Sequence, residues 1–145
     1  MRRRLLAGFV VCGMGLVLAG APASAADGGR KFAVAMTGAE EAPDPGDPDG
    51  SGTASFRFNP GRETVCYTLT VEDVDDVTAA HIHKAPAGVA GAVVIGLAPP
   101  TTGTSSACAT VDRGLAIDIF RNPADYYVNV HSADFPGGAV RGQLA

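Results

Sequence analysis

The feature that most constrains the fold is the alternation of apolar and polar residues along short segments of the chain. In GTASFRFN (52–59), the apolar side chains Ala54, Phe56 and Phe58 share one face of an extended chain. After the turn residues Asn-Pro-Gly-Arg, the segment TVCYTLTV (64–71) alternates in the same way. Because successive side chains of a strand point to opposite faces, the two segments indicate a hairpin with one buried face.

The same alternation recurs along the rest of the chain, with glycine, proline and aspartate between the runs. One segment differs: RGLAIDIFRNP (113–123) has apolar spacings that suit a short helical turn and ends at Asn-Pro. We therefore predict an all-β fold, an antiparallel Greek-key β-sandwich or flattened barrel with one short helical turn. The further strand candidates are 31–37, 77–83, 91–97, 106–111, 126–132 and 139–144.

The first twenty-five residues have the pattern of a signal peptide. Three arginines (2–4) precede an apolar run (5–18), and Ala-Ser-Ala (23–25) matches a signal peptidase site. We therefore predict a signal peptide at 1–25, a single domain at 26–145, and a secreted protein with no membrane attachment after cleavage. The three arginines leave twin-arginine export open as an alternative to the general route.

Charge and cysteine content narrow the choice of partners and compartment. Removing residues 1–25 takes away three arginines and no acid, so the net charge changes from −4 to about −7. This acidity argues against nucleic acid and anionic membranes as partners. Two cysteines remain, Cys66 and Cys108, and in an oxidising compartment they most simply form one disulfide. Two free buried thiols are the alternative.

All three histidines of the chain lie in two of the predicted strands. Strand alternation puts His81 and His83 on one face and the apolar Ile82 on the other. By the same reasoning Asn129 and His131 point away from the core. If the two strands are neighbours in a suitable register, three imidazoles converge as copper or zinc requires. Otherwise these are ordinary surface histidines on a polar face.

Motifs of the common catalytic classes do not occur in the sequence. It has no Gly-x-Ser-x-Gly, no phosphate-binding glycine loop and no His-Glu-x-x-His. Neither remaining cysteine has a histidine beside it. We therefore expect a binding protein rather than an enzyme.

Two long motifs resemble the CHRD domain, a module named after chordin and also present in exported bacterial proteins. They are VTAAHIHKAPAGVAGAVVIGL (77–97) and PADYYVNVHSADFPGGAVRGQL (123–144). The resemblance extends to MTGAEEAP (36–43) and GSGTASFRF (50–58), and so to nearly the whole mature chain. It implies an extracellular module, as in chordin, which binds growth factors. One departure from the family pattern is Lys84, where glycine is frequent.

The chain also has a more distant resemblance to copper-zinc superoxide dismutases, which are Greek-key β-barrels. In those enzymes a His-x-His strand and a later histidine hold copper, with an arginine nearby. Here His81, His83, His131 and Arg141 follow in that order, but no further histidine exists to bridge to zinc, and the long zinc-binding loop is missing. The resemblance implies a three-histidine copper site, with Arg141 as an anion-attracting group. Asn129 or a backbone carbonyl would orient one ring.

Two hypotheses for function follow from the sequence. The first is a secreted, non-catalytic module that binds another extracellular protein or a small ligand, with the three histidines as a candidate surface metal site. The alternative is a copper-binding protein, for copper capture or dismutase-like redox chemistry, that uses His81, His83 and His131.

Overall fold

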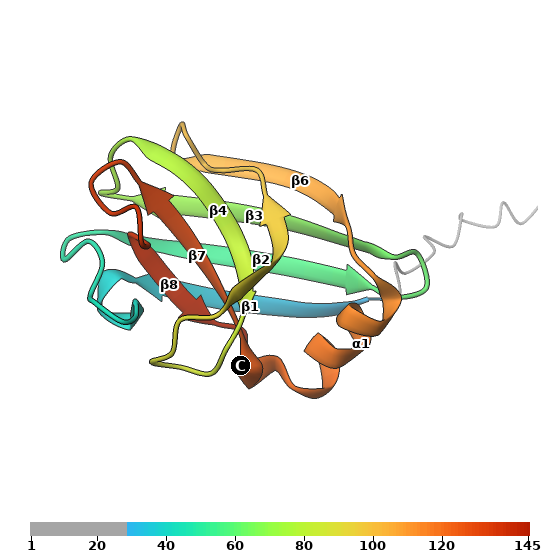
Figure 1. The fold of residues 1–145 in the computed structure, drawn as a ribbon. Coiled ribbons are helices and arrows are strands. Elements are labelled where there is room, and N and C mark those ends of the chain that lie inside the picture. The colour runs from blue at the N-terminus through green and yellow to red at the C-terminus, as the bar shows by residue number, and fades with distance from the viewer. Residues whose placement is uncertain (1–28) are drawn as a thin grey trace, which may run out of the picture.

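The computed structural model describes residues 29–145, which form eight strands, one α-helix and two short 3-10 helices (Figure 1). The predicted signal peptide lies outside the described residues. The strands are β1 (Arg30–Thr37), β2 (Ser51–Asn59), β3 (Thr64–Glu72), β4 (Val77–Lys84), β5 (Ala92–Leu97), β6 (Thr104–Thr110), β7 (Tyr126–Ser132) and β8 (Val140–Gln143). The helical elements are η1 (Gly38–Glu40), α1 (Arg113–Arg121) and η2 (Pro123–Asp125).

The strands form one antiparallel sheet that is nearly closed into a flattened barrel. Its order is β5-β4-β7-β8-β1-β2-β3-β6, and Figure 1 shows β4 and β7 crossing in front of β1–β3. Just past the end of edge strand β5, Ala98 O accepts a hydrogen bond from Ser105 Oγ of the other edge strand, β6, at 2.7 Å. Ala98 N donates to Tyr67 Oη of β3, the neighbour of β6, at 2.7 Å. The predicted all-β fold is therefore confirmed.

The core consists of the apolar residues that the alternation assigned to the inner face. Phe56 and Phe58 of β2 are 2% and 0% exposed, and Ile82 of β4 and Val128 of β7 are 0% exposed. The hairpin prediction is confirmed, because β2 and β3 are antiparallel neighbours that pair from Ser51–Glu72 to Asn59–Thr64. Alternation places these residues because one face of each strand packs inside the barrel.

The predicted helical turn is a nine-residue helix, α1, which connects β6 to β7. Asp112 caps its N-terminus by accepting a hydrogen bond from the Leu115 N–H at 3.0 Å. Asp118 on α1 accepts hydrogen bonds from Lys84 Nζ at 2.7 Å and from the Tyr126 hydroxyl. These contacts anchor the helix to the end of β4 that carries His83.

The two cysteines of the described chain form the predicted disulfide. Cys66 on β3 lies directly opposite Cys108 on β6, and the Cα atoms are 3.9 Å apart. The bond joins β3 to the edge strand β6 across 42 residues of sequence.

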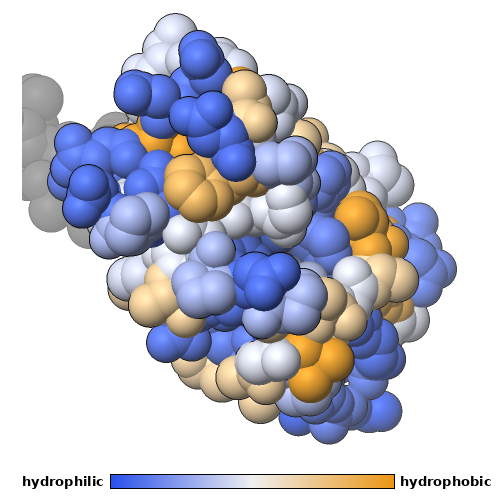
Figure 2. Space-filling view, turned by 60° about the vertical axis from the view of Figure 1, so that its left-hand side comes forward, coloured by the Kyte–Doolittle hydropathy of each residue, from blue (hydrophilic) through white to orange (hydrophobic). Residues whose placement is uncertain are grey.

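Few large hydrophobic side chains are exposed on the surface of residues 29–145. Val89 and Val93 are its exposed large hydrophobic residues, at 49% and 52%. In Figure 2 the hydrophobic residues of the face shown form small, separate groups among hydrophilic ones. No helix in this part of the chain has the length and apolar character needed to span a membrane.

Candidate metal centre

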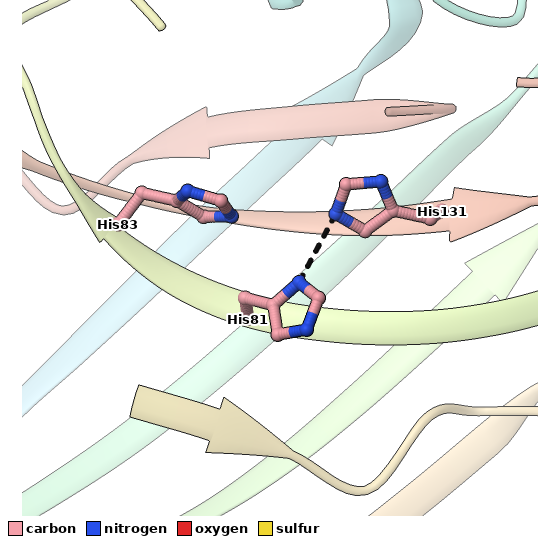
Figure 3. Close-up of side chains that lie close together, drawn as sticks. All are labelled: His81, His83 and His131. Atoms are coloured by element: carbon pink, nitrogen blue, oxygen red, sulfur yellow. Dashed lines mark hydrogen bonds between the residues drawn. The ribbon is translucent and has the colours of Figure 1, made fainter. Parts of the chain in front are cut away.

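The candidate centre lies on the face of β4 and β7 that points away from the core. The two strands are antiparallel neighbours, with His81 opposite Asn129 and Ala79 opposite His131. In this register the two strands bring all three imidazoles together, as Figure 3 shows. The condition that the sequence left open, adjacent strands in suitable register, is met.

The ring nitrogens are close enough for a single metal ion. One nitrogen from each of His81, His83 and His131 lies within 4.8 Å of the other two. His81 Nδ1 and His131 Nε2 are 3.1 Å apart. Three nitrogens at about 2.0–2.1 Å from one ion would be about 3.3–3.6 Å from one another, so a ring shift of about 1 Å completes the geometry.

Backbone carbonyls fix the tautomers of two of the rings. His83 Nδ1 lies 2.9 Å from Gly91 O, and His131 Nδ1 lies 3.0 Å from Pro136 O. A carbonyl oxygen only accepts, so in each ring Nδ1 carries the hydrogen and Nε2 carries the lone pair. His83 Nε2 and His131 Nε2 would therefore be the ligating atoms. Because His131 Nε2 carries the lone pair, His81 Nδ1, 3.1 Å away, carries a hydrogen in the metal-free protein, and His81 would bind through Nδ1 once that hydrogen moves to Nε2.

Burial favours the neutral form of His81 and His131 and leaves one nitrogen of His83 without a partner. Burial, and next the nearby His131 and His83, lower the pKa of His81. Burial is also the main cause that lowers the pKa of His131. Neutral imidazole is the form that binds metals. His83 is 7% exposed and its Nε2 has no hydrogen-bond partner, a cost of about 1–3 kcal/mol that a bound ion would remove.

An aromatic stack supports His83 from the side. The His83 and Tyr127 rings are parallel to within 7°, with centroids 4.7 Å apart. The Tyr127 hydroxyl accepts a hydrogen bond from Gly91 N at 3.2 Å, so Gly91 binds both rings. A Cβ at Gly91 would lie 2.1 Å from Lys84 O, which explains why only glycine fits at this position.

The loop that carries Gly91 is held in place by the C-terminal strand. Arg141 of β8 donates to the carbonyls of Val89 and Pro86, both at 2.9 Å. Gln143 donates to Ala85 O at 2.8 Å. Since residues 85–91 pass from β4 to β5, these bonds fix the loop whose last residue orients His83.

A buried carboxylic acid, that of Glu41, lies next to Asn129 of β7. Glu41 is 8% exposed and hydrogen-bonds with Asn129, itself 1% exposed. Burial raises the pKa of Glu41 to about 7, against smaller lowering effects of Asn129 and the charge of Arg141. Glu41 Oε1 and Asn129 Oδ1 have no hydrogen-bond partner within the protein. A Cβ on Gly138 would collide with this carboxyl at 2.1 Å, so the turn at Gly138 closes over it.

The structure corrects one expectation about the site. A surface site was expected, but His83 is buried and His81 and His131 are half-buried. Gly91, at the end of the loop 85–91, hydrogen-bonds with His83 and with Tyr127 on this face, and Arg141 hydrogen-bonds to the carbonyls of Pro86 and Val89 in the same loop. Arg141 is 1% exposed and its bonds are to carbonyls, so attraction of anions remains a prediction.

Some supporting residues were not recognised in the sequence. Of the two ring-orienting groups that the sequence offered, a backbone carbonyl is the one observed, from Gly91 and from Pro136, although the sequence did not say which residues supply it; Asn129 Oδ1 makes no hydrogen bond. Glu41 and Gln143 were also missed. The one signal for these two was their place in the motifs MTGAEEAP and VRGQL.

Comparisons with known proteins agree with the motifs. The family model described as the CHRD domain matches residues 32–144, which include β4, β7, β8 and all three histidines. No curated protein and no solved structure matches the chain. Because the family model spans most of its length, the chain belongs to the CHRD domain family.

Proposed function

We propose that this protein is a secreted copper-binding CHRD protein that holds one copper ion through His81 Nδ1, His83 Nε2 and His131 Nε2. The observation that carries the proposal is the cluster itself: one ring nitrogen from each histidine lies within 4.8 Å of the other two, and Nε2 of the buried His83 has no hydrogen-bond partner. Such an arrangement lowers the stability of the metal-free protein. This cost is offset when a metal ion accepts the lone pairs of the ring nitrogens.

Copper is favoured over other divalent ions by the kind of ligand. The cluster consists of three imidazoles and contains no carboxylate or thiolate. Imidazole suits copper, zinc, iron and nickel, and among the divalent first-row ions copper binds most tightly at a given nitrogen site. The three protein nitrogens leave further coordination positions for solvent or a small ligand.

Three features support export. CHRD domains are modules of the extracellular type, and the protein contains a Cys66–Cys108 disulfide. Disulfides persist in oxidising compartments. The signal-peptide pattern at 1–25 gives the same answer from the sequence. Copper capture outside the cytoplasm is the role that best fits this combination.

The test is a copper titration of the metal-free mature protein against a competing chelator. We expect one copper per chain, and a loss of affinity of at least about 100-fold in His81→Ala, His83→Ala and His131→Ala taken separately. Thr68→Ala, on the exposed face of β3, is the matched control and should bind like the wild type. The chain has no other histidine, so no background imidazole site interferes. Equal weak binding by all the histidine variants and the wild type would refute the proposal.

A second candidate function follows from the family match: a module that binds another extracellular protein or a small ligand, with the histidines as a structural cluster. This hypothesis predicts that the three histidine variants keep their fold, and that their affinity for copper is no weaker than that of the wild type. The titration above therefore separates the two functions.

A further inference from the structure

We infer that the site binds Cu(I) in preference to Cu(II), because the buried guanidinium of Arg141 places a fixed positive charge beside it. The inference rests on the proposed function, since it concerns the oxidation state of the copper that the three histidines hold.

Arg141 is close to the cluster and shielded from solvent. It is 1% exposed and lies opposite Asn129, which in turn lies opposite His81. Its Cζ lies 3.4 Å from the centroid of Tyr127, whose ring stacks on His83 at 4.7 Å. The two distances together place the guanidinium carbon within about 8 Å of the centre of the His83 ring.

The groups that contact the guanidinium do not cancel its charge. Its hydrogen bonds go to the carbonyl oxygens of Val89 and Pro86 and to Gln143 Oε1, all of them uncharged. Glu41 is the acid that acts on it, and burial favours the neutral form of that carboxyl. The neighbouring cation Lys84 is paired with Asp118 on the helix.

The charge distinguishes the two oxidation states. Cu(II) brings one more positive charge than Cu(I) into a site whose protein ligands are neutral imidazoles. At a separation on the order of 10 Å and an effective dielectric constant of about 20, one extra unit charge near a cation weakens binding on the order of tenfold. Cu(II) also prefers a tetragonal set of four ligands, whereas the cluster supplies three nitrogens. Both effects favour Cu(I).

The test measures the ratio of the two dissociation constants, Cu(II) over Cu(I), by competition with bicinchoninate for Cu(I) under anaerobic ascorbate and with nitrilotriacetate for Cu(II). For the wild type we expect a ratio above ten. Arg141→Gln should lower the ratio about tenfold, while Arg141→Lys, which keeps the charge but not the planar fork, should keep the wild-type ratio within about threefold. A purely structural role of Arg141 would instead weaken both ions equally in both variants.

Glu41→Gln provides an independent variant in case the Arg141 variants do not fold. It replaces the carboxyl by a neutral amide and so removes whatever negative charge the ionised fraction of Glu41 contributes, which means that the ratio should equal or exceed that of the wild type. A wild-type ratio below one, an unchanged ratio in Arg141→Gln, or a lowered ratio in Glu41→Gln would overturn the inference. If neither Cu(I) nor Cu(II) binds, the proposed copper site itself is refuted. If copper binds tightly but Cu(II) is preferred, only the inference about the oxidation state is refuted.

Discussion

The buried carboxyl of Glu41 makes the stability of the metal-free protein depend on pH in a defined way. Burial raises the pKa of this group from 4.5 to about 7. In the unfolded chain the carboxyl loses its proton near pH 4.5, whereas in the folded protein it keeps the proton until about pH 7. Between these values the unfolded state binds fewer protons, so stability falls as the pH rises.

The size of the effect follows from the shift. At 1.36 kcal/mol per pH unit, the difference between the two pKa values amounts to about 3 kcal/mol lost between pH 4 and pH 8. Glu41→Gln keeps the shape of the side chain and removes the titration. The variant should therefore gain about 3 kcal/mol relative to the wild type over this range.

Urea denaturation of both proteins at pH 4, 5, 6, 7 and 8, without metal, measures the difference directly. The lowered pKa values of His81 and His131 affect both proteins and cancel in the comparison. Glu40→Gln removes one carboxylate from the exposed neighbouring position and is the matched control. A difference between wild type and Glu41→Gln that stays constant within about 0.5 kcal/mol across the range would refute the reasoning.

Two further predictions concern the loop and the disulfide. Gly91→Ala should weaken copper binding by about 10–100-fold in a chelator competition, because a Cβ 2.1 Å from Lys84 O displaces the Gly91 carbonyl that orients His83. The control variant Gly61→Ala, in the β2–β3 turn, should bind copper like the wild type. Equal copper affinities of the two variants would contradict this role of Gly91. Replacing both Cys66 and Cys108 by serine should cost about 4 kcal/mol in urea denaturation, from the chain entropy of a 42-residue separation. A loss below about 1 kcal/mol would contradict that estimate.

The sequence allowed the strands and the core to be predicted because their signal is local. Alternation assigned Phe56, Phe58 and Ile82 to the interior, and all three are buried. The boundaries of β7 were also predicted, at 126–132. In both cases the side-chain period of two and the flanking turn residues contain the necessary information.

The burial of the histidine face was not predictable in the same way. Alternation placed Asn129 on the face that points away from the core, but its side chain is 1% exposed. Contacts between distant parts of the chain bury this face: Arg141 hydrogen-bonds to carbonyls of the loop 85–91, more than fifty residues earlier, and Glu41 hydrogen-bonds with Asn129. Contacts to backbone carbonyls, including that of Gly91 to His83, depend on no particular side chain at the acceptor and leave no pattern in the sequence.

Glu41 shows a different limit. It belongs to an acidic, proline-rich segment of the kind that is usually solvated, and its neighbour Glu40 is exposed. Only the tertiary structure, in which the turn at Gly138 closes over the carboxyl, shows that one of the two acids is buried.

The central claim, a single copper ion held by three histidine nitrogens, is tested most directly by anomalous diffraction at the copper edge from crystals of the copper-loaded protein. We expect one peak per chain, at about 2.0 Å from His81 Nδ1, His83 Nε2 and His131 Nε2, with Gly91 O and Pro136 O still bonded to the Nδ1 atoms of their rings. A copper peak away from these three nitrogens, or one bound by only one of the rings, would contradict the account.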